Sequence, residues 1–329
     1  MPLAVGPVAL PNRVFLAPMS GVTDAPFRRL AASLGTGVVV SEMIASNALA
    51  EGRREQQRRL KGEGLRLNIV QLAGCEARWM AEGARIAQGA GADIIDINMG
   101  CPAKHVTGLQ SGSALMRDLD HALGLIEAVV GAVRVPVMLK MRLGWDHASR
   151  NAPELARRAE AAGVCLVTVH ARTRAQFFKG TADWGQVRRV KDAVRIPVVI
   201  NGDIVDPATA RAALAASGAD AVMIGRGAYG APWMPGRIAE YLSTGNDPGP
   251  PDIPTQGEIA LAHIEAMLVQ EGERNGLRNA RKHIGWYLAR SGCAAEAVKA
   301  WRRQLCTSED ARQVLAGLAT FYEQVREAA

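Results

Sequence analysis

Five side chains that can move protons or bind polar ligands stand where apolar runs of this chain stop. They are Asn98, Cys101, Lys140, His170 and Asn201. A thiol is largely protonated near neutral pH and can act as an acid, whereas a lysine ammonium group stabilises a nearby anion. The residue types therefore indicate acid–base chemistry on a polar or anionic ligand, provided that the fold brings them together.

The spacing around these residues indicates how they are brought together. Seven residues separate a glycine from the end of the following run in three places: Gly91 to Asn98, Gly163 to His170 and Gly218 to Gly225. A second repeat aligns 132–140 with 193–201, which puts Lys140 and Asn201 at equivalent strand ends. In a barrel of parallel strands, polar residues at the carboxyl ends build the active site. We therefore expect all five around one mouth.

Eight strands alternating with helices are predicted, which favours a (β/α)8 TIM barrel over a doubly wound sheet. Asp24 is predicted to cap the first helix, with Pro26 in its tolerated first turn. The other helices are expected at 76–88, 117–132, 152–162, 184–193 and 206–216. The strands are expected at Val14–Pro18, Gly37–Glu42, Leu67–Leu72, Asp93–Asn98, Val137–Arg142, Cys165–His170, Val198–Asn201 and Ala221–Gly225.

The chain changes character after the predicted barrel. We expect the barrel in residues 1–242, a Pro/Gly-rich linker in 243–256 and a small all-α helical bundle in 257–329. The linker prediction depends on four prolines and two glycines between Ser243 and Pro254. From about Gln256 onward the pattern is helical, and no strand is predicted.

Composition limits the class of protein. With 329 residues, of which 48% are hydrophobic, the chain can bury a large core. No apolar stretch approaches the roughly 20 residues that span a bilayer, and the N-terminus lacks a signal-peptide pattern. The five cysteines form no C-x-x-C pair. We therefore expect a cytoplasmic protein without disulfides, metal or membrane contact. A net charge of +7 agrees with a polyanionic partner, although many basic proteins bind none.

Seven short motifs occur in the order found in the tRNA-dihydrouridine synthase family. The chain resembles this family over essentially its whole length. The segment Arg281–Tyr287 resembles the bacterial B-type branch. The motifs are Ala17–Asp24, Gln71–Gly74, Asn98–Pro102, Lys140–Arg142, His170–Thr173, Asn201–Asp203 and Gly225-Arg226.

The resemblance implies a reaction. In that family FMN, reduced by NADPH, passes hydride from N5 to C6 of a uracil in tRNA, and a cysteine thiol protonates C5. Carried over, Cys101 is the catalytic acid. Its Gly-Cys-Pro turn would hold the thiol beside the flavin. The other four cysteines are expected to be packing residues, as most free cysteines are.

The resemblance also implies the residues that bind FMN. Lys140 would stabilise the anionic reduced ring, although a lysine at a strand end can also reach solvent. His170 would contact flavin or phosphate, or else be a packed core residue, and Met19 can serve both the ring and the core. The full set of expected cofactor residues is Ala17, Pro18, Met19, Gln71, Lys140, His170, Asn201, Gly202, Asp203, Gly225 and Arg226.

One motif permits two interpretations. Residues 225–230 form a G-x-G-x-x-G directly after a strand, which taken alone indicates a dinucleotide-binding Rossmann turn. That turn belongs early in a βαβ unit, with an acidic residue about 20 positions on, whereas here Glu240 comes too early. We therefore expect Gly225 and Arg226 to bind a phosphate, as loops after the seventh and eighth barrel strands commonly do.

Substrate contacts are predicted for Asn98, Arg142 and Arg172, with the uracil, and for Lys104, with the adjoining backbone. The loop through 111–113 is expected to act as a lid. In the last domain, eight cations oppose Glu296 alone between Arg274 and Arg303, and Arg281 and Lys282 are the predicted tRNA contacts. Trp286, Tyr287 and Trp301 could stack on bases, or could be core residues beneath a solvated face.

We therefore expect a monomeric enzyme that reduces uridines in the D-loop of the tRNA elbow, with the target base drawn out of its stack. Two rivals remain. One is an FMN barrel enzyme acting on a free pyrimidine, which has no need of a basic tail. The other is an RNA-binding protein that has lost catalysis, which the presence of Cys101 and Lys140 opposes.

Overall fold

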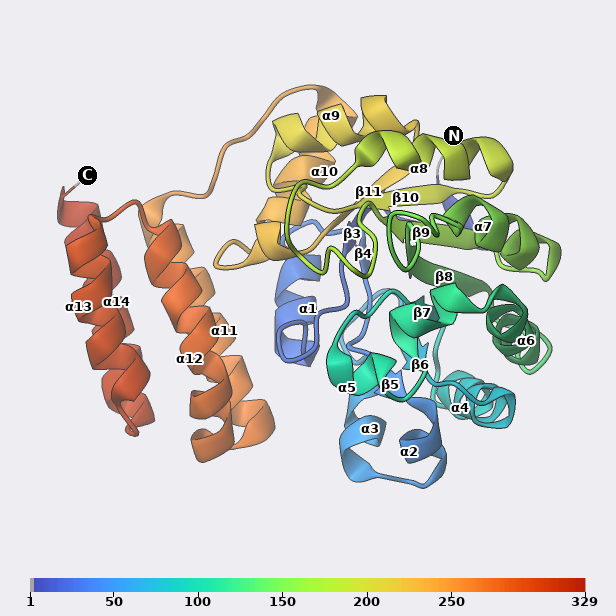
Figure 1. The fold of residues 1–329 in the computed structure, drawn as a ribbon. Helices are drawn as coiled ribbons and strands as arrows, with labels where there is room; N and C mark the ends of the chain where they lie inside the picture. The colour runs from blue at the N-terminus through green and yellow to red at the C-terminus, as the bar shows by residue number, and fades with distance from the viewer. Residues whose placement is uncertain (1–2, 329) are drawn as a thin grey trace.

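The computed structural model describes residues 3–328, whose main part is a curled sheet of nine parallel strands surrounded by helices (Figure 1). The strand order is β4-β3-β11-β10-β9-β8-β7-β6-β5. A bridge between Val40 and Ile69 joins the two ends into a barrel. The strands are β3 (Val14–Leu16), β4 (Val38–Val39), β5 (Ile44–Ala45), β6 (Ile69–Ala73), β7 (Ile94–Met99), β8 (Val137–Arg142), β9 (Leu166–His170), β10 (Val198–Asn201) and β11 (Ala221–Ile224).

The (β/α)8 barrel is confirmed, with one difference at the second strand position. Only Val38–Val39 of the strand predicted at Gly37–Glu42 forms a strand, β4, which pairs with β3, and β5, beyond the predicted range, pairs with β6. The break falls at Ser41, whose Oγ accepts the Gln71 N–H at 2.9 Å in place of a ladder partner. Two short segments therefore share one position of the barrel.

The helices largely follow the predictions. Asp24 caps α1, because its side chain accepts the Phe27 N–H, and Pro26 lies in the first turn. The predicted 184–193 helix matches α8 at both ends. The barrel helices are α1 (Ala25–Ser33), α2 (Ser46–Ala50), α3 (Arg54–Arg59), α4 (Ala77–Gly89), α5 (Lys104–Thr107), α6 (Leu119–Val130), α7 (Ala152–Ala161), α8 (Trp184–Ala193), α9 (Pro207–Ser217) and α10 (Met234–Thr244).

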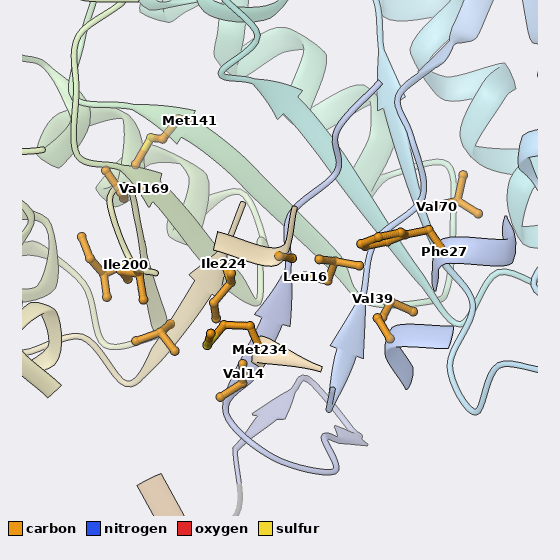
Figure 2. Close-up of a cluster of buried hydrophobic side chains, with 14 of the residues drawn as sticks. Val14, Leu16, Phe27, Val39, Val70, Met141, Val169, Ile200, Ile224 and Met234 are labelled. Carbon is orange, nitrogen blue, oxygen red and sulfur yellow. The ribbon is translucent and has the colours of Figure 1, made fainter. Parts of the chain in front are cut away.

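Side chains on both faces of the sheet are buried, in two separate cores. Outward-facing residues pack against the helices; Figure 2 shows Val14, Leu16 and Ile224 in this cluster with Phe27 of α1 and Met234 of α10. Inward-facing residues of the same strands fill the barrel, and a hairpin of β1 (Ala4–Val5) and β2 (Val8–Ala9) contributes to that inner core. Burial on both faces explains the continuous apolar runs of the sequence.

The inward-facing positions change character along each strand. In β8, Met138 lies in the inner core, and Lys140 and Arg142 follow at the next two inward positions. In β7, Ile94 is likewise followed by Asp96 and Asn98. Because strand side chains alternate with period two, these polar groups all face the barrel axis near its carboxyl end. The barrel thus has an apolar base and a polar mouth.

The irregular stretch after the barrel is shorter than the predicted 243–256. Helix α10 continues to Thr244, and α11 begins at Ile253, capped by Asp252 with Pro254 tolerated in the first turn. Four helices follow and form a layer beside the barrel (Figure 1): α11 (Ile253–Glu271), α12 (Glu273–Arg290), α13 (Ala295–Thr307) and α14 (Ala311–Ala328). Among residues 3–328, no helix is long and apolar enough to cross a membrane.

Aromatic rings join this helical domain to the barrel. Phe27 of α1 lies 5.3 Å from the His263 ring and 5.6 Å from the His283 ring. The Tyr287 hydroxyl and His263 Nδ1 share a hydrogen bond of 3.0 Å. Burial lowers the pKa of His263 to about 3, and burial with the neighbouring His263 and Lys282 lowers the pKa of His283 well below its ordinary value. Both imidazoles are therefore neutral in the folded protein.

This burial predicts acid sensitivity. Below pH 6.5 the unfolded chain binds protons that the folded interface excludes, so stability present at pH 7 is lost as the pH falls. Each histidine should cost about 2 kcal/mol of unfolding free energy at pH 5. Urea unfolding of His283→Gln should show a smaller loss between pH 7 and pH 5 than the wild type. The exposed His121→Gln should keep the wild-type loss, and equal losses in all three proteins would contradict the assignment.

Candidate active site

A cavity of about 700 Å3 opens at the carboxyl ends of the strands. The strands converge there, so residues far apart in the chain share one lining. The sequence-predicted residues that line the cavity are Ala17, Pro18, Met19, Gln71, Asn98, Cys101, Lys140, Arg142, His170, Asn201, Gly202, Asp203, Gly225 and Arg226. All five residues expected around one mouth therefore meet in it.

A chain of hydrogen bonds joins the ends of two neighbouring strands, β6 and β7. Gln71 Nε2 donates to Asp96 Oδ2 at 2.7 Å, and Asn98 Nδ2 donates to Gln71 Oε1 at 2.8 Å. Burial raises the pKa of Asp96, against the opposing effects of the Gln71 hydrogen bond and the Lys140 charge. Because each amide has a fixed partner at both its oxygen and its nitrogen, the orientation of Gln71 and Asn98 is set before any ligand arrives.

The same chain ends on the turn that carries Cys101. Asn98 Oδ1 accepts the N–H groups of Gly100 and Cys101, each at 3.0 Å. The Cys101 carbonyl accepts the Ser113 N–H at 3.0 Å and the Ser113 hydroxyl at 2.9 Å, and Arg142 Nε donates to the Gly100 carbonyl at 2.8 Å. The backbone is thus held on both sides of the thiol. Such restraint is what a proton donor in a fixed geometry requires.

Lys140 is the unusual charge of the cavity. Within residues 3–328, no hydrogen bond or ion pair involves its ammonium group. Burial lowers the pKa of Lys140, and the neighbouring Arg142 lowers it further, while Asp96 and Cys101 act in the opposite direction. Lys140 is half-buried, and a cation partly withdrawn from water without a partner is poorly stabilised. This arrangement favours a ligand that supplies an anion or acceptor here.

His170 lies between several cations. Burial, followed by the charges of Arg142, Lys140 and Arg172, lowers its pKa well below the ordinary value, so the ring is neutral. Arg172 Nη1 lies 3.4 Å from His170 Nε2. Since a guanidinium group can only donate, Nε2 is the acceptor and Nδ1 carries the proton. Half-buried and lining the cavity, His170 is not the fully packed core residue that the sequence left open.

Two loops close the cavity beside β10 and β11. Asp203 accepts from Arg172 at 2.5 Å, from Arg226 at 3.2 Å and from the Ala182 N–H at 2.8 Å. Gly227 of the second loop packs against the first, since a Cβ there would lie 2.7 Å from the Ile204 carbonyl oxygen. Within the 225–230 motif, Gly227 therefore serves loop packing, and Gly230 allows a close approach to the Trp286 carbonyl. A three-residue 3-10 turn, Arg226–Ala228, follows the strand in place of the helix that a Rossmann turn requires.

Two residues predicted to contact substrate lie outside the cavity lining. Arg172 is 1% exposed, and its guanidinium donates to the carbonyls of Lys179 and Gly180 and to Asp203. Its position makes it a support for Asp203. Lys104 is exposed on α5 and does not line the cavity. Arg142 does line it, although Nε and Nη1 donate to backbone carbonyls of Gly100, Thr173 and Phe177.

The loop expected to act as a lid is divided. Residues 111–116 are buried, and Ser113 holds the Cys101 carbonyl, so this half is part of the scaffold. The preceding residues 108–110 are exposed. Residues 111–116 are therefore a fixed support, and lid movement by the exposed residues 108–110 stays a prediction.

Sequence reasoning missed an aromatic rim. Phe177 and Phe178 line the cavity although both are partly exposed, and their rings meet edge to face at 4.7 Å. The guanidinium groups of Arg142 and Arg226 each lie 5.6 Å from the Phe178 ring. Exposed aromatic rings beside a polar cavity offer a surface for a flat ligand. Two consecutive phenylalanines in a loop were the sequence feature that could have indicated this rim.

The predicted base-stacking aromatics of the helical domain are used inside the protein. Tyr287 is buried on His263, and Trp301 packs on Phe321 at 5.8 Å. Trp286 stacks on Tyr229, a cavity residue, at 3.9 Å. Tyr287, which is 1% exposed, is therefore a core residue and cannot stack on a base. Trp286 and Trp301 are half-buried and each pack on an aromatic neighbour, so base stacking by these two rings stays a prediction.

The basic residues of that domain are mostly exposed. None of the eight cations between Arg274 and Arg303 forms an ion pair with a carboxylate in the part of the chain that the structure describes. Six of them are exposed, whereas Arg281 and Lys282 are half-buried. Arg281 donates weakly to the Ser308 carbonyl, and Lys282 Nζ lies close to Gly21 at the cavity rim. The two predicted tRNA contacts thus sit at helix and domain junctions.

Comparison with known proteins agrees with this geometry. The family described as "Dihydrouridine synthase (Dus)" matches residues 15–327. The chain belongs to the dihydrouridine synthase family. A probable tRNA-dihydrouridine synthase of Rhizobium leguminosarum bv. phaseoli is 55% identical over 93% of this chain and 94% of that protein. The tRNA-dihydrouridine synthase B of Xanthomonas campestris pv. campestris is 47% identical over 87% of this chain and 86% of its own.

Solved structures with the same barrel are more distant. An old yellow enzyme homologue from Zymomonas mobilis has a TM-score of 0.53 at 14% identity, covering 78% of this chain and 95% of that one. A morphinone reductase mutant in complex with tetrahydroNAD has a TM-score of 0.52 at 17% identity, covering 78% and 92%. These likenesses establish the fold. Membership of the dihydrouridine synthase family identifies this protein as an oxidoreductase.

The amide chain predicts a stability effect. Asn98→Ala removes four hydrogen bonds, one of them to the Met43 sulfur, and leaves Gln71 Oε1 and two turn N–H groups without a partner. We expect the unfolding free energy to fall by about 2–3 kcal/mol in urea titrations. The matched control is Asn246→Ala, an exposed amide of the inter-domain stretch, which should change it by less than about 0.5 kcal/mol. Equal small losses would mean that Asn98 does not hold the turn.

Proposed function

We propose that this protein reduces the C5=C6 bond of uridines in the tRNA D-loop to 5,6-dihydrouridine, using FMN and NADPH. The observation that carries the proposal is the joint placement of a held thiol, Cys101, and an unpaired ammonium, Lys140, on one cavity. The Cys101 thiol can donate a proton, and the Lys140 ammonium group can stabilise an anionic reduced flavin ring. Their combination with family membership favours flavin-dependent reduction.

The residues present fit FMN. The Lys140 ammonium group, which has no hydrogen-bond partner within residues 3–328, offers one for the pyrimidine end of the ring, and the fixed Gln71 amide lines the same cavity from β6. Ala17, Pro18 and Met19 supply an apolar wall. The loops of 201–203 and 225–226, with the half-exposed Arg226 side chain, offer backbone groups and positive charge for the phosphate. Neutral His170 can contribute a hydrogen bond there.

When bound, FMN supplies the hydride that C6 of the uracil receives. The protein supplies the other hydrogen: the Cys101 S–H bond breaks, its proton goes to C5, and a thiolate remains. Lys140 and Arg142 both interact electrostatically with Cys101 and would stabilise this thiolate until water reprotonates it. The Asn98 and Ser113 hydrogen bonds keep the sulfur in place while its charge changes.

The helical domain supports RNA, rather than a free pyrimidine, as the substrate. Its exposed cations lack carboxylate partners in residues 3–328, so they are free to neutralise phosphates. Helix α12, which carries several of them, also packs on the cavity rim through the Trp286–Tyr229 stack. A tRNA bound along this domain is therefore held next to the mouth. An enzyme of free pyrimidines gains nothing from such a surface.

The test is direct. Purified protein with FMN and NADPH should introduce dihydrouridine into tRNA from a strain that lacks the gene, mapped by mass analysis to D-loop positions. Free uridine should react far more slowly. Reduction of free uridine with no product in tRNA would support an enzyme of small pyrimidines and contradict the proposal.

Lys140 yields a separate prediction. Lys140→Met keeps the length of the side chain and removes the charge, so FMN should bind at least about tenfold more weakly in fluorescence titrations. Without FMN, the variant should be as stable as the wild type or more so, because a half-buried charge without a hydrogen-bond partner in residues 3–328 is gone.

Lys140→Arg, which keeps the charge, should retain more FMN than Lys140→Met. The exposed Lys61→Met, with a side chain that is 63% accessible, should bind FMN as the wild type does. Unaltered flavin affinity in Lys140→Met would contradict the role of this residue.

A further inference from the structure

A second cavity of about 330 Å3 lies beside the proposed active site. Met43, in the segment between β4 and β5, lines both cavities. The second one lies among α2, α3, the start of α4 and the α5 segment, and no role has been assigned to it above. Its size is at the lower end of the range for pockets that hold small organic groups.

The lining combines a flat ring with unused polar groups. Trp79 of α4 is half-buried, and the Arg78 guanidinium lies 4.3 Å from its ring centre. Gln56 Oε1 accepts the Ala45 N–H, which leaves its amide nitrogen available. Within residues 3–328, neither this nitrogen nor the Trp79 indole N–H has a hydrogen-bond partner. Arg59 also lines the cavity, where it donates to the Met43 carbonyl and pairs with Glu55, and Glu76 belongs to the same lining.

The cavity also adjoins the segment that carries Cys101. His105 and Val106 of α5 form part of its wall, whereas Ala103, just before α5, lines the active-site cavity. Ser111 Oγ donates to the Gly74 carbonyl at 3.2 Å and ties the end of this segment to the β6 loop. A group in the second cavity would therefore touch the segment between Cys101 and Ser113.

We propose that this cavity binds the base of a nucleotide next to the target uridine in the RNA, an inference that rests on the proposed function. A ring that stacks and hydrogen-bond donors that read carbonyl or ring-nitrogen acceptors are the groups that recognise an unstacked base. The shared Met43 wall makes the two cavities neighbours, so a chain with one base in the mouth brings the next base here. Extraction of the target base frees such a neighbour from its stack.

The test compares three variants. Trp79→Ala should raise the Kd and the KM for tRNA about tenfold, because it removes a stacking surface. Trp79→Phe should recover most of the loss. Arg85→Ala, an exposed charge on the same helix, should behave as the wild type. Flavin reduction by NADPH without RNA should be equal in all of them.

A second measurement places the base itself. Two tRNAs, each lacking the base on one side of the target uridine, should differ in affinity for the wild type. The tRNA that binds more weakly lacks the base that stacks on Trp79. Trp79→Ala should therefore not weaken its binding further, because that stacking contact is already absent. Additive losses would overturn the assignment.

Other outcomes are also decisive. If Trp79→Ala slows flavin reduction by NADPH and leaves the Kd for tRNA unchanged, the cavity holds the coenzyme. If Trp79→Ala equals Arg85→Ala in every measurement, the cavity holds no ligand of the reaction. A wild type that binds tRNA and makes no dihydrouridine would refute the proposed function alone, because the Kd comparison still tests the cavity.

Discussion

The hydrogen-bond chain from Asp96 through Gln71 and Asn98 to Cys101 is the constraint on which this active site depends. Its members come from two neighbouring strands and one turn, yet each fixes the next. Low dielectric strengthens such a chain and makes any gap in it costly. Because the ends of the chain are a buried carboxyl group and the turn of the thiol, the barrel interior itself sets where the sulfur lies.

The sequence allowed the prediction of most of this barrel. Strand ends were visible because burial on both faces makes each strand a continuous apolar run, and a polar residue such as Lys140 or Asn201 interrupts it. The divided second strand was not predictable, since a side chain, Ser41, replaces a backbone partner there. Which strand residues face inward emerges only from the register between strands, as with the pairing of Asn98 and Lys140.

Long-range partners explain the remaining differences. The motif predicted that Arg172 contacts the uracil, but its guanidinium group is hydrogen-bonded to Asp203, 31 residues away. The basic segment around Tyr287 indicated a nucleic-acid contact, but the Tyr287 hydroxyl forms a hydrogen bond with His263 on the preceding helix. Phe177 and Phe178 belong to no motif and still form the rim. In each case the decisive neighbour is distant in the chain, which spacing alone does not reveal.

Helix α12 connects the two halves of the molecule. Lys282 lies near Gly21 of the loop after β3, and Trp286 stacks on Tyr229 of the loop after β11. Arg290 donates to the Tyr229 carbonyl at 3.3 Å. The helix thus spans loops from two strand ends while its domain presents unpaired cations to solvent. The position of the helical domain and the shape of the mouth are therefore set together.

The central claim is that Cys101 donates the proton that completes the reduction. Rapid mixing of the flavin-loaded Cys101→Ala variant separates the two half-reactions. The account predicts that NADPH reduces the flavin at the wild-type rate, while reoxidation by tRNA slows by a factor of at least about 100, the usual contribution of a positioned acid. Reoxidation by tRNA at the wild-type rate would contradict it.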